Sequence, residues 1–145
     1  MRKLLYIVGV DGSEWSERAV ERAVHLAQQT GANVKLVYVI TWQEFQPLMV
    51  EGIAPPMLDN KQVEHDAKRK ILQPLIEKYQ VAGLHLTSEY IWGEPAEVLH
   101  QYVKDHHANM LFVGRRGRSL FVDFLLGSVA NKLAHYVGIP IVLVP

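Results

Sequence analysis

The sequence lacks several features that would place it in a specialised class. It has no cysteine, which excludes a disulfide framework and a thiolate metal site and is compatible with a reducing compartment. Neither sign of charge is in excess, because lysine plus arginine and aspartate plus glutamate each number 15. Since a nucleic-acid-binding protein usually carries a basic excess, we expect no nucleic-acid partner. No apolar run approaches the ~18 residues that a membrane span needs, so we expect no membrane insertion and a cytoplasmic location.

Short apolar runs alternate with longer amphipathic stretches along the 145 residues, a length that predicts one domain over 1–145. Residues 4–10 form a continuous apolar run, which is typical of a strand buried on both faces. The same reasoning predicts four more strands and four helices, and it leaves 41–60 as a long variable loop. The further strands are expected at 34–40, 84–91, 110–113 and 139–144, and the helices after Ser13, over about 61–79, from Pro95 and over about 128–136. This alternation predicts an α/β fold with a mostly parallel sheet and helices on both faces.

Two prolines refine this prediction. Pro74 falls inside the helix expected at 61–79, where a missing N–H group kinks or splits a helix. Pro140 favours an edge position for the last strand, because proline cannot complete a ladder of hydrogen bonds. Since the residues of that strand are apolar on both faces, its exposed edge invites pairing with another strand.

The segment from Gly114 to Val129 begins where an apolar strand ends and finishes where a helix begins. A helix N-terminus presents unpaired N–H groups and a partial positive charge, which suit a phosphate group. Gly127 would let an anion approach the backbone, and Ser128 could add a hydroxyl donor.

Further features of this segment also suit phosphate. Gly114 and Gly117 would permit the positive-φ backbone of a loop that wraps an anion. Arginines follow at 115, 116 and 118. The alternative is an ordinary strand-to-helix loop with capping glycines and solvated arginines. The absence of both a P-loop lysine motif and a GxGxxG motif leaves this alternative open.

The spacing Gly114-x2-Gly117-x9-Gly127-Ser128 resembles the ATP-binding signature of the universal stress protein family, G-x2-G-x9-G-[S/T]. Other parts of the chain also resemble the family, namely 8–13, 37–40, 93–96 and 127–145. The resemblance therefore covers essentially the whole chain apart from 41–60. Residues 120–124 depart from the family pattern, because they are more apolar and include Asp123.

The resemblance implies a five-stranded parallel sheet in the order 3-2-1-4-5, an adenine-nucleotide α-hydrolase-like fold. In such a sheet the strand order reverses between the first and fourth strands, and a ligand crevice opens at their carboxyl ends. Those ends are Asp11 and Gly114 in this sequence.

The resemblance also implies a role for each matching residue. Adenine and ribose would lie among Gly9, Val10, Asp11 and Val39, with backbone groups of Val113 and Gly114 on the ribose. Phosphates would be bound by Gly117, Gly127, Ser128 and Val129, largely through main-chain N–H groups, with Arg116 and Arg118 as supplementary contacts or solvated side chains. For Asp11 the alternative is a turn that caps the first helix through its carboxylate.

We therefore expect a universal stress protein that binds ATP, with AMP or ADP as alternatives and with Mg²⁺ accompanying the phosphates. We expect it to act in the stress response as a nucleotide-dependent regulator of a protein partner. A slow ATPase is one alternative, although no general base or lysine suited to fast phosphoryl transfer is evident, and no catalytic residue or protein metal ligand is predicted. A protein-interaction module that has lost nucleotide binding is the other. Because the family commonly pairs its last strand with a second copy, we expect a homodimer through residues 137–145.

Overall fold

The computed structural model describes residues 2–42, 60–117 and 126–145. Within these ranges the strands and helices follow one another as predicted. The strands are β1 (Leu5–Val10), β2 (Asn33–Ile40), β3 (Leu86–Trp92), β4 (Met110–Gly114) and β5 (Ile141–Val144). The helices are α1 (Glu14–Thr30), α2 (Asn60–Asp66), α3 (Gln73–Tyr79), α4 (Pro95–Asp105) and α5 (Ser128–Tyr136), with a π-helical segment, Ala67–Leu72, between α2 and α3.

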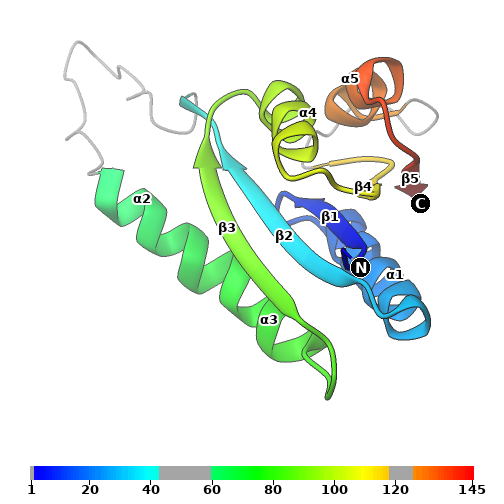
Figure 1. The fold of residues 1–145 in the computed structure, drawn as a ribbon. Helices are drawn as coiled ribbons and strands as arrows, with labels where there is room; N and C mark the ends of the chain where they lie inside the picture. The colour runs from blue at the N-terminus through cyan, green and yellow to red at the C-terminus, as the bar shows by residue number, and fades with distance from the viewer. Residues whose placement is uncertain (1, 43–59, 118–125) are drawn as a thin grey trace, which may run out of the picture.

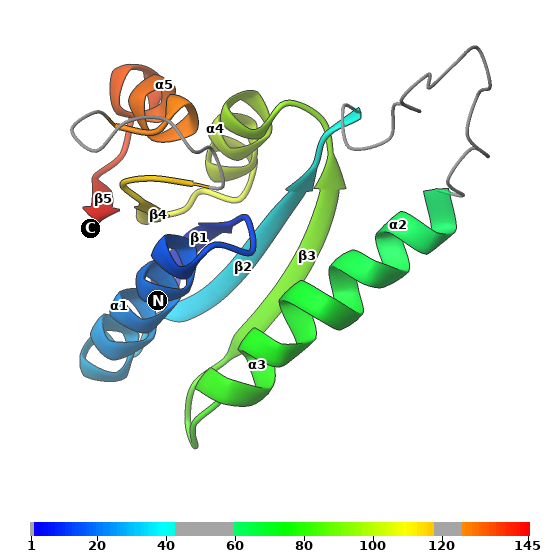
Figure 2. The same ribbon diagram turned by 180° about the vertical axis from the view of Figure 1, so that it is seen from behind.

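The strands form one parallel sheet in the order β3-β2-β1-β4-β5, which confirms the predicted topology. From β1 the chain moves outward through β2 to β3, and it then crosses back to β4 on the other side of β1. Because crossovers between parallel strands are right-handed, this reversal of direction sends the helices to opposite faces. Figures 1 and 2 show α1 with the long helix of α2 and α3 on one face, and α4 with α5 on the other.

Each face of the sheet carries its own apolar layer. Alternate residues of β1 illustrate this, since Val8 belongs to the cluster that contains the α1 side chains, whereas Ile7 belongs to the cluster that contains Leu99 of α4. Both are fully buried. A central strand buried on both faces has to be apolar at every position, which is why β1 is a continuous apolar run; Leu4, the first residue of the predicted run, precedes β1 and is exposed.

The helix predicted over 61–79 contains the irregularity expected at Pro74. The π-helical segment ends just before this proline, and the N–H of Gln73 donates to the carbonyl of Lys68, five residues earlier. Pro74 then follows this change of register directly, in the first turn of α3. A change in hydrogen-bond register therefore accommodates Pro74 within one long helix (Figure 2).

The last strand, β5, lies at the edge of the sheet beside β4, as predicted. Pro140 precedes β5 instead of lying within it, and its carbonyl accepts a hydrogen bond from the N–H of Leu111. No helix in the described part of the chain combines the length and the apolar character that crossing a bilayer would require.

Candidate functional site

A cavity of about 360 Å³ opens where β1, β2 and β4 end, at the point where the strand order reverses. Every residue predicted to bind nucleotide lines this cavity, apart from Arg118, which lies outside the described residues together with 120–124. The lining residues are Gly9, Val10, Asp11, Ser16, Val37, Val39, Pro95, Leu99, Val113, Gly114, Arg116, Gly117, Gly127, Ser128, Val129 and Ala130. The topology thus gathers residues from widely separated parts of the sequence at one place.

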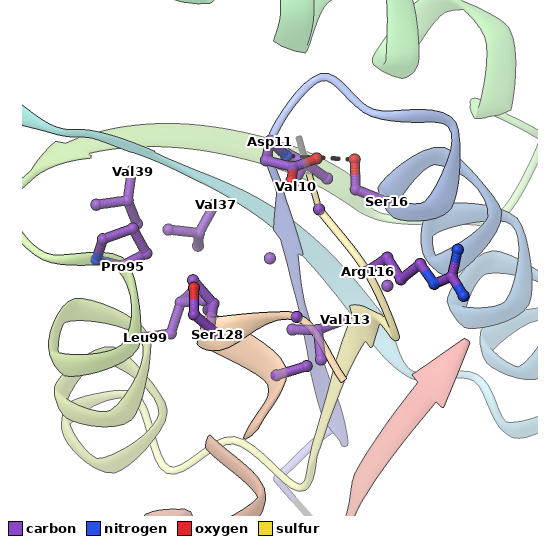
Figure 3. A pocket seen from close by; sticks show the side chains of 16 residues that line it. Val10, Asp11, Ser16, Val37, Val39, Pro95, Leu99, Val113, Arg116 and Ser128 are labelled. Atoms are coloured by element: carbon purple, nitrogen blue, oxygen red, sulfur yellow. Dashed lines mark hydrogen bonds between the residues drawn. The ribbon is translucent and has the colours of Figure 1, made fainter. Parts of the chain in front are cut away.

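One side of the cavity is apolar. Val37 and Val39 project from β2, and Pro95 and Leu99 from α4, as Figure 3 shows. Gly9 lets Leu99 and Val113 pack directly against β1, because a Cβ atom there would lie 2.8 Å from the Leu99 Cδ1 atom and 3.2 Å from the Val113 Cγ1 atom. A flat apolar group fits such a surface.

Asp11 forms a turn before α1, which was the predicted alternative to a contact with ribose. Its Oδ1 atom accepts a hydrogen bond from the N–H of Ser13 at 2.9 Å, and its own N–H donates to the Ser16 hydroxyl at 3.2 Å (Figure 3). Ser13 in turn caps α1 by accepting from the N–H of Ser16. The carboxylate also faces Gly117, where a Cβ atom would lie 2.5 Å from Oδ2. Contact between Asp11 and a ribose remains a prediction.

The prediction of a positive φ angle at Gly114 and Gly117 is wrong, because neither is among the glycines with that conformation. Both are required for close packing instead. A Cβ atom at position 114 would lie 2.7 Å from the Arg116 carbonyl oxygen and 2.9 Å from the main-chain carbon of Trp15. At position 117 it would collide with Asp11, as described above. These glycines let the end of β4 approach the start of α1.

The N-terminus of α5 faces the cavity, and no side chain in the described part of the chain caps it. Gly127 occupies the N-cap position, and Ser128, Val129 and Ala130 form the first turn, where N–H groups have no partner within the helix. By contrast, Ser13 caps α1 and the carboxylate of Glu94 caps α4. All three helices begin at the carboxyl edge of the sheet, and of the three only α5 begins without a cap from a described side chain.

Gly127 differs from its neighbours because its N–H group donates to the Arg115 carbonyl at 2.8 Å. The predicted phosphate contact through this N–H would therefore require that bond to break. The donors that face the cavity from α5 are those of the three residues after Gly127.

Arg116 lines the cavity at its opposite side. In Figure 3 its side chain extends away from Val37, Val39 and Leu99. A contact between its guanidinium and a phosphate remains a prediction.

Sequence reasoning missed five of the lining residues, which are Ser16, Val37, Pro95, Leu99 and Ala130. Two signals could have found some of them. Val37 is two residues before the predicted Val39 on the same strand, so both side chains point to the same face. Leu99 follows Pro95 by one helical turn, so a wall formed by the start of α4 includes both.

A buried tyrosine anchors α4 to the sheet below this cavity. The Tyr102 hydroxyl donates to the Glu89 carboxylate of β3 at 2.6 Å. Burial, and then this bond, raise the pKa of Tyr102, so the hydroxyl stays protonated. The arrangement fixes the helix that carries Pro95 and Leu99.

The described residues include no group of three or more histidine, aspartate or glutamate side chains that could hold a metal ion.

The model of a family described as the Universal stress protein family matches residues 6–145. The chain belongs to this family. Among curated family members, the universal stress protein YxiE of Bacillus subtilis (strain 168) is 29% identical over 142 residues, which cover 95% of this chain and 96% of the relative.

Solved structures of the family share the fold. UspA from Lactobacillus plantarum superposes with a TM-score of 0.73 at 21% identity, over 100% of this chain and 99% of the other. A universal stress protein in complex with cAMP superposes with a TM-score of 0.71 at 23% identity, over 100% of this chain and 98% of the other. The universal stress protein from Archaeoglobus fulgidus in complex with dAMP superposes with a TM-score of 0.66 at 16% identity, over 99% of this chain and 98% of the other. The chain therefore has the adenine-nucleotide α-hydrolase-like fold of these proteins.

Proposed function

We propose that this universal stress protein binds an adenine nucleotide, ATP in the first place, and acts as a nucleotide-dependent regulator. The observation that carries the proposal is the N-terminus of α5, which no described side chain caps, at the wall of the 360 Å³ cavity. A helix N-terminus in this position offers several N–H donors and a partial positive charge to one anionic group. The donors that would meet a phosphate are those of Ser128, Val129 and Ala130.

The two sides of the cavity match the two parts of a nucleotide. The apolar surface of Val37, Val39 and Leu99 would receive the base, and the start of α5 would receive the phosphates. The volume falls within the range of about 300–1,000 Å³ that is usual for small-molecule sites. Asp11 also lines the cavity, where its carboxylate could accept a hydrogen bond from a ribose hydroxyl.

Two solved relatives support the choice of an adenine ligand, because one structure is a complex with cAMP and another a complex with dAMP. Regulation is favoured over catalysis by the composition of the cavity wall. In the described part of the chain, its charged side chains are Asp11 and Arg116, and no lysine lines it. Rapid phosphoryl transfer would need a lysine at the phosphates together with a positioned general base.

Calorimetric titration of the purified protein with ATP, ADP, AMP and adenosine tests the proposal. The expected result is saturable binding in which the phosphorylated ligands bind more tightly than adenosine, because only they reach α5. GTP serves as the control for base selectivity. A protein that binds none of the adenine ligands would overturn the proposal and favour an interaction module without a nucleotide.

We also propose that two copies pair through residues 137–145. The strand β5 lies at the sheet edge, and Ile141, Val142 and Leu143 are each only partly buried in the single chain. Pairing along this edge would satisfy the outward main-chain groups and cover apolar surface.

A further inference from the structure

An ion pair connects the two helices that wall the cavity. Glu94 immediately precedes Pro95, the first residue of α4, and Lys132 lies one turn into α5. The Lys132 Nζ atom is 3.7 Å from the Glu94 Oε1 atom. Neither side chain lines the cavity, but each is on a helix whose first residues do.

The Glu94 carboxylate has two partners, one for each oxygen. Oε2 accepts a hydrogen bond from the N–H of Glu97 at 2.9 Å and so caps α4, while Oε1 faces Lys132. The cap uses an ordinary hydrogen bond that a neutral amide oxygen could also accept. The ion pair, by contrast, depends on the negative charge. The two roles can therefore be separated by substitution.

Lys132 is well placed to leave this partner for a ligand. It follows Ser128 by four residues, so both are on the same side of α5, and helical side chains lean toward the helix N-terminus. Its side chain is therefore directed toward the end of α5 at which Ser128, Val129 and Ala130 line the cavity. The Lys132 and Glu94 side chains are 55% and 39% exposed. An exposed pair of this kind stabilises a fold only slightly, so an exchange of partners costs little.

We propose that Lys132 is a phosphate-binding residue of the nucleotide site, and that Glu94 is the positioning residue that holds its ammonium at the edge of the cavity until a phosphate replaces the carboxylate. The inference rests on the proposed function. Lys132 would add a side-chain cation beside the start of α5, where the described lining residues of that helix contribute only N–H groups and a hydroxyl. A ligand with several phosphate charges needs such a cation more than a nucleoside does.

Titrations of the full-length Lys132→Met and Glu94→Gln variants with ATP and with adenosine test this assignment. Lys132→Met keeps most of the side-chain length and removes the charge, so ATP affinity should fall about tenfold, as expected for one charge-assisted contact. Glu94→Gln keeps an oxygen to cap α4 and releases the ammonium, so ATP affinity should rise about threefold. Adenosine affinity should stay unchanged in both variants. The dependence of ATP affinity on salt concentration should weaken only in Lys132→Met.

The outcomes separate the possible errors. Equal losses of ATP and adenosine affinity in both variants would mean that the pair only braces α4 against α5, and would overturn the inference. Unchanged ATP affinity in Lys132→Met would overturn it as well, while leaving the proposed function intact. A wild-type protein that binds no adenine ligand would overturn the proposed function itself, and this inference with it.

Discussion

The N–H of Gly127 donates to the carbonyl of Arg115 at 2.8 Å, so the start of α5 is joined to the backbone just after β4. Packing at this junction is close, because a Cβ atom on Gly127 would lie 3.3 Å from the Arg116 Cα atom. A substitution at Gly127 would therefore disturb the junction as well as any bound anion. Ser128 follows directly and provides a cleaner test of the helix N-terminus.

Gly114→Ala should lower the free energy of unfolding by about 1–3 kcal/mol, because the added methyl group meets main-chain atoms of Trp15 and Arg116 that cannot move independently. Gly138→Ala is the matched control, and both variants are measured at a protein concentration that keeps the chain monomeric, because Gly138 lies within the proposed dimer segment 137–145. Its φ angle is not positive and a Cβ atom there meets nothing within 4 Å, so stability should be unchanged or slightly higher. Urea unfolding of both variants measures the difference. Equal stabilities would contradict the packing role of Gly114.

Glu17→Gln should destabilise the protein at neutral pH but not at low pH. The bond from the Lys78 ammonium, 2.6 Å long, is the largest cause that lowers the pKa of Glu17 below its ordinary value of 4.5. Because the folded pKa is the lower one, the stabilisation is present above the unfolded pKa and is lost as pH falls through the folded pKa. The loss at pH 7 should stay below about 1 kcal/mol, since the pair is partly exposed.

Urea unfolding of wild type and Glu17→Gln at pH 7 and near pH 3 measures this effect. The two midpoints should differ at pH 7 and converge at the lower pH. The same difference at both pH values would show that the charge of Glu17 is not its source.

Leu143→Pro should dissociate the proposed dimer, whereas Leu143→Ala should not. The carbonyls of Pro140 and Val144 accept hydrogen bonds from the β4 side, so alternation turns the main-chain groups of Leu143 toward the open edge. Proline removes the outward N–H, and alanine keeps it while it also shortens the side chain. Light scattering after size-exclusion chromatography gives the mass of each variant. A dimer that persists in Leu143→Pro would place the interface elsewhere.

The fold could be predicted from local patterns because each strand is a short apolar run and each helix has an amphipathic spacing or a capping residue such as Ser13. The predicted site residues share one cavity because the sheet reverses direction beside β1. What could not be predicted depends on contacts between distant residues. No pattern in the sequence predicts that Trp15 approaches Gly114 or that Gly127 bonds to Arg115. These two contacts explain why glycine is needed at positions 114 and 127. The π-helical register before Pro74 is a further case, since the sequence predicts only that the helix is disturbed.

The most direct test of the account compares Ser128→Pro with Ser128→Ala in calorimetric titrations with ATP and adenosine. Proline is favoured at the first position of a helix, and Gly127 before it has φ −58° and ψ 155°, which a following proline tolerates. Ser128→Pro therefore removes one N–H donor from an intact α5, and Ser128→Ala removes only the hydroxyl. The account predicts that Ser128→Pro lowers ATP affinity about tenfold more than Ser128→Ala does, with adenosine affinity equal in both. Equal ATP affinities in the two variants would contradict the claim that the N-terminus of α5 binds phosphate.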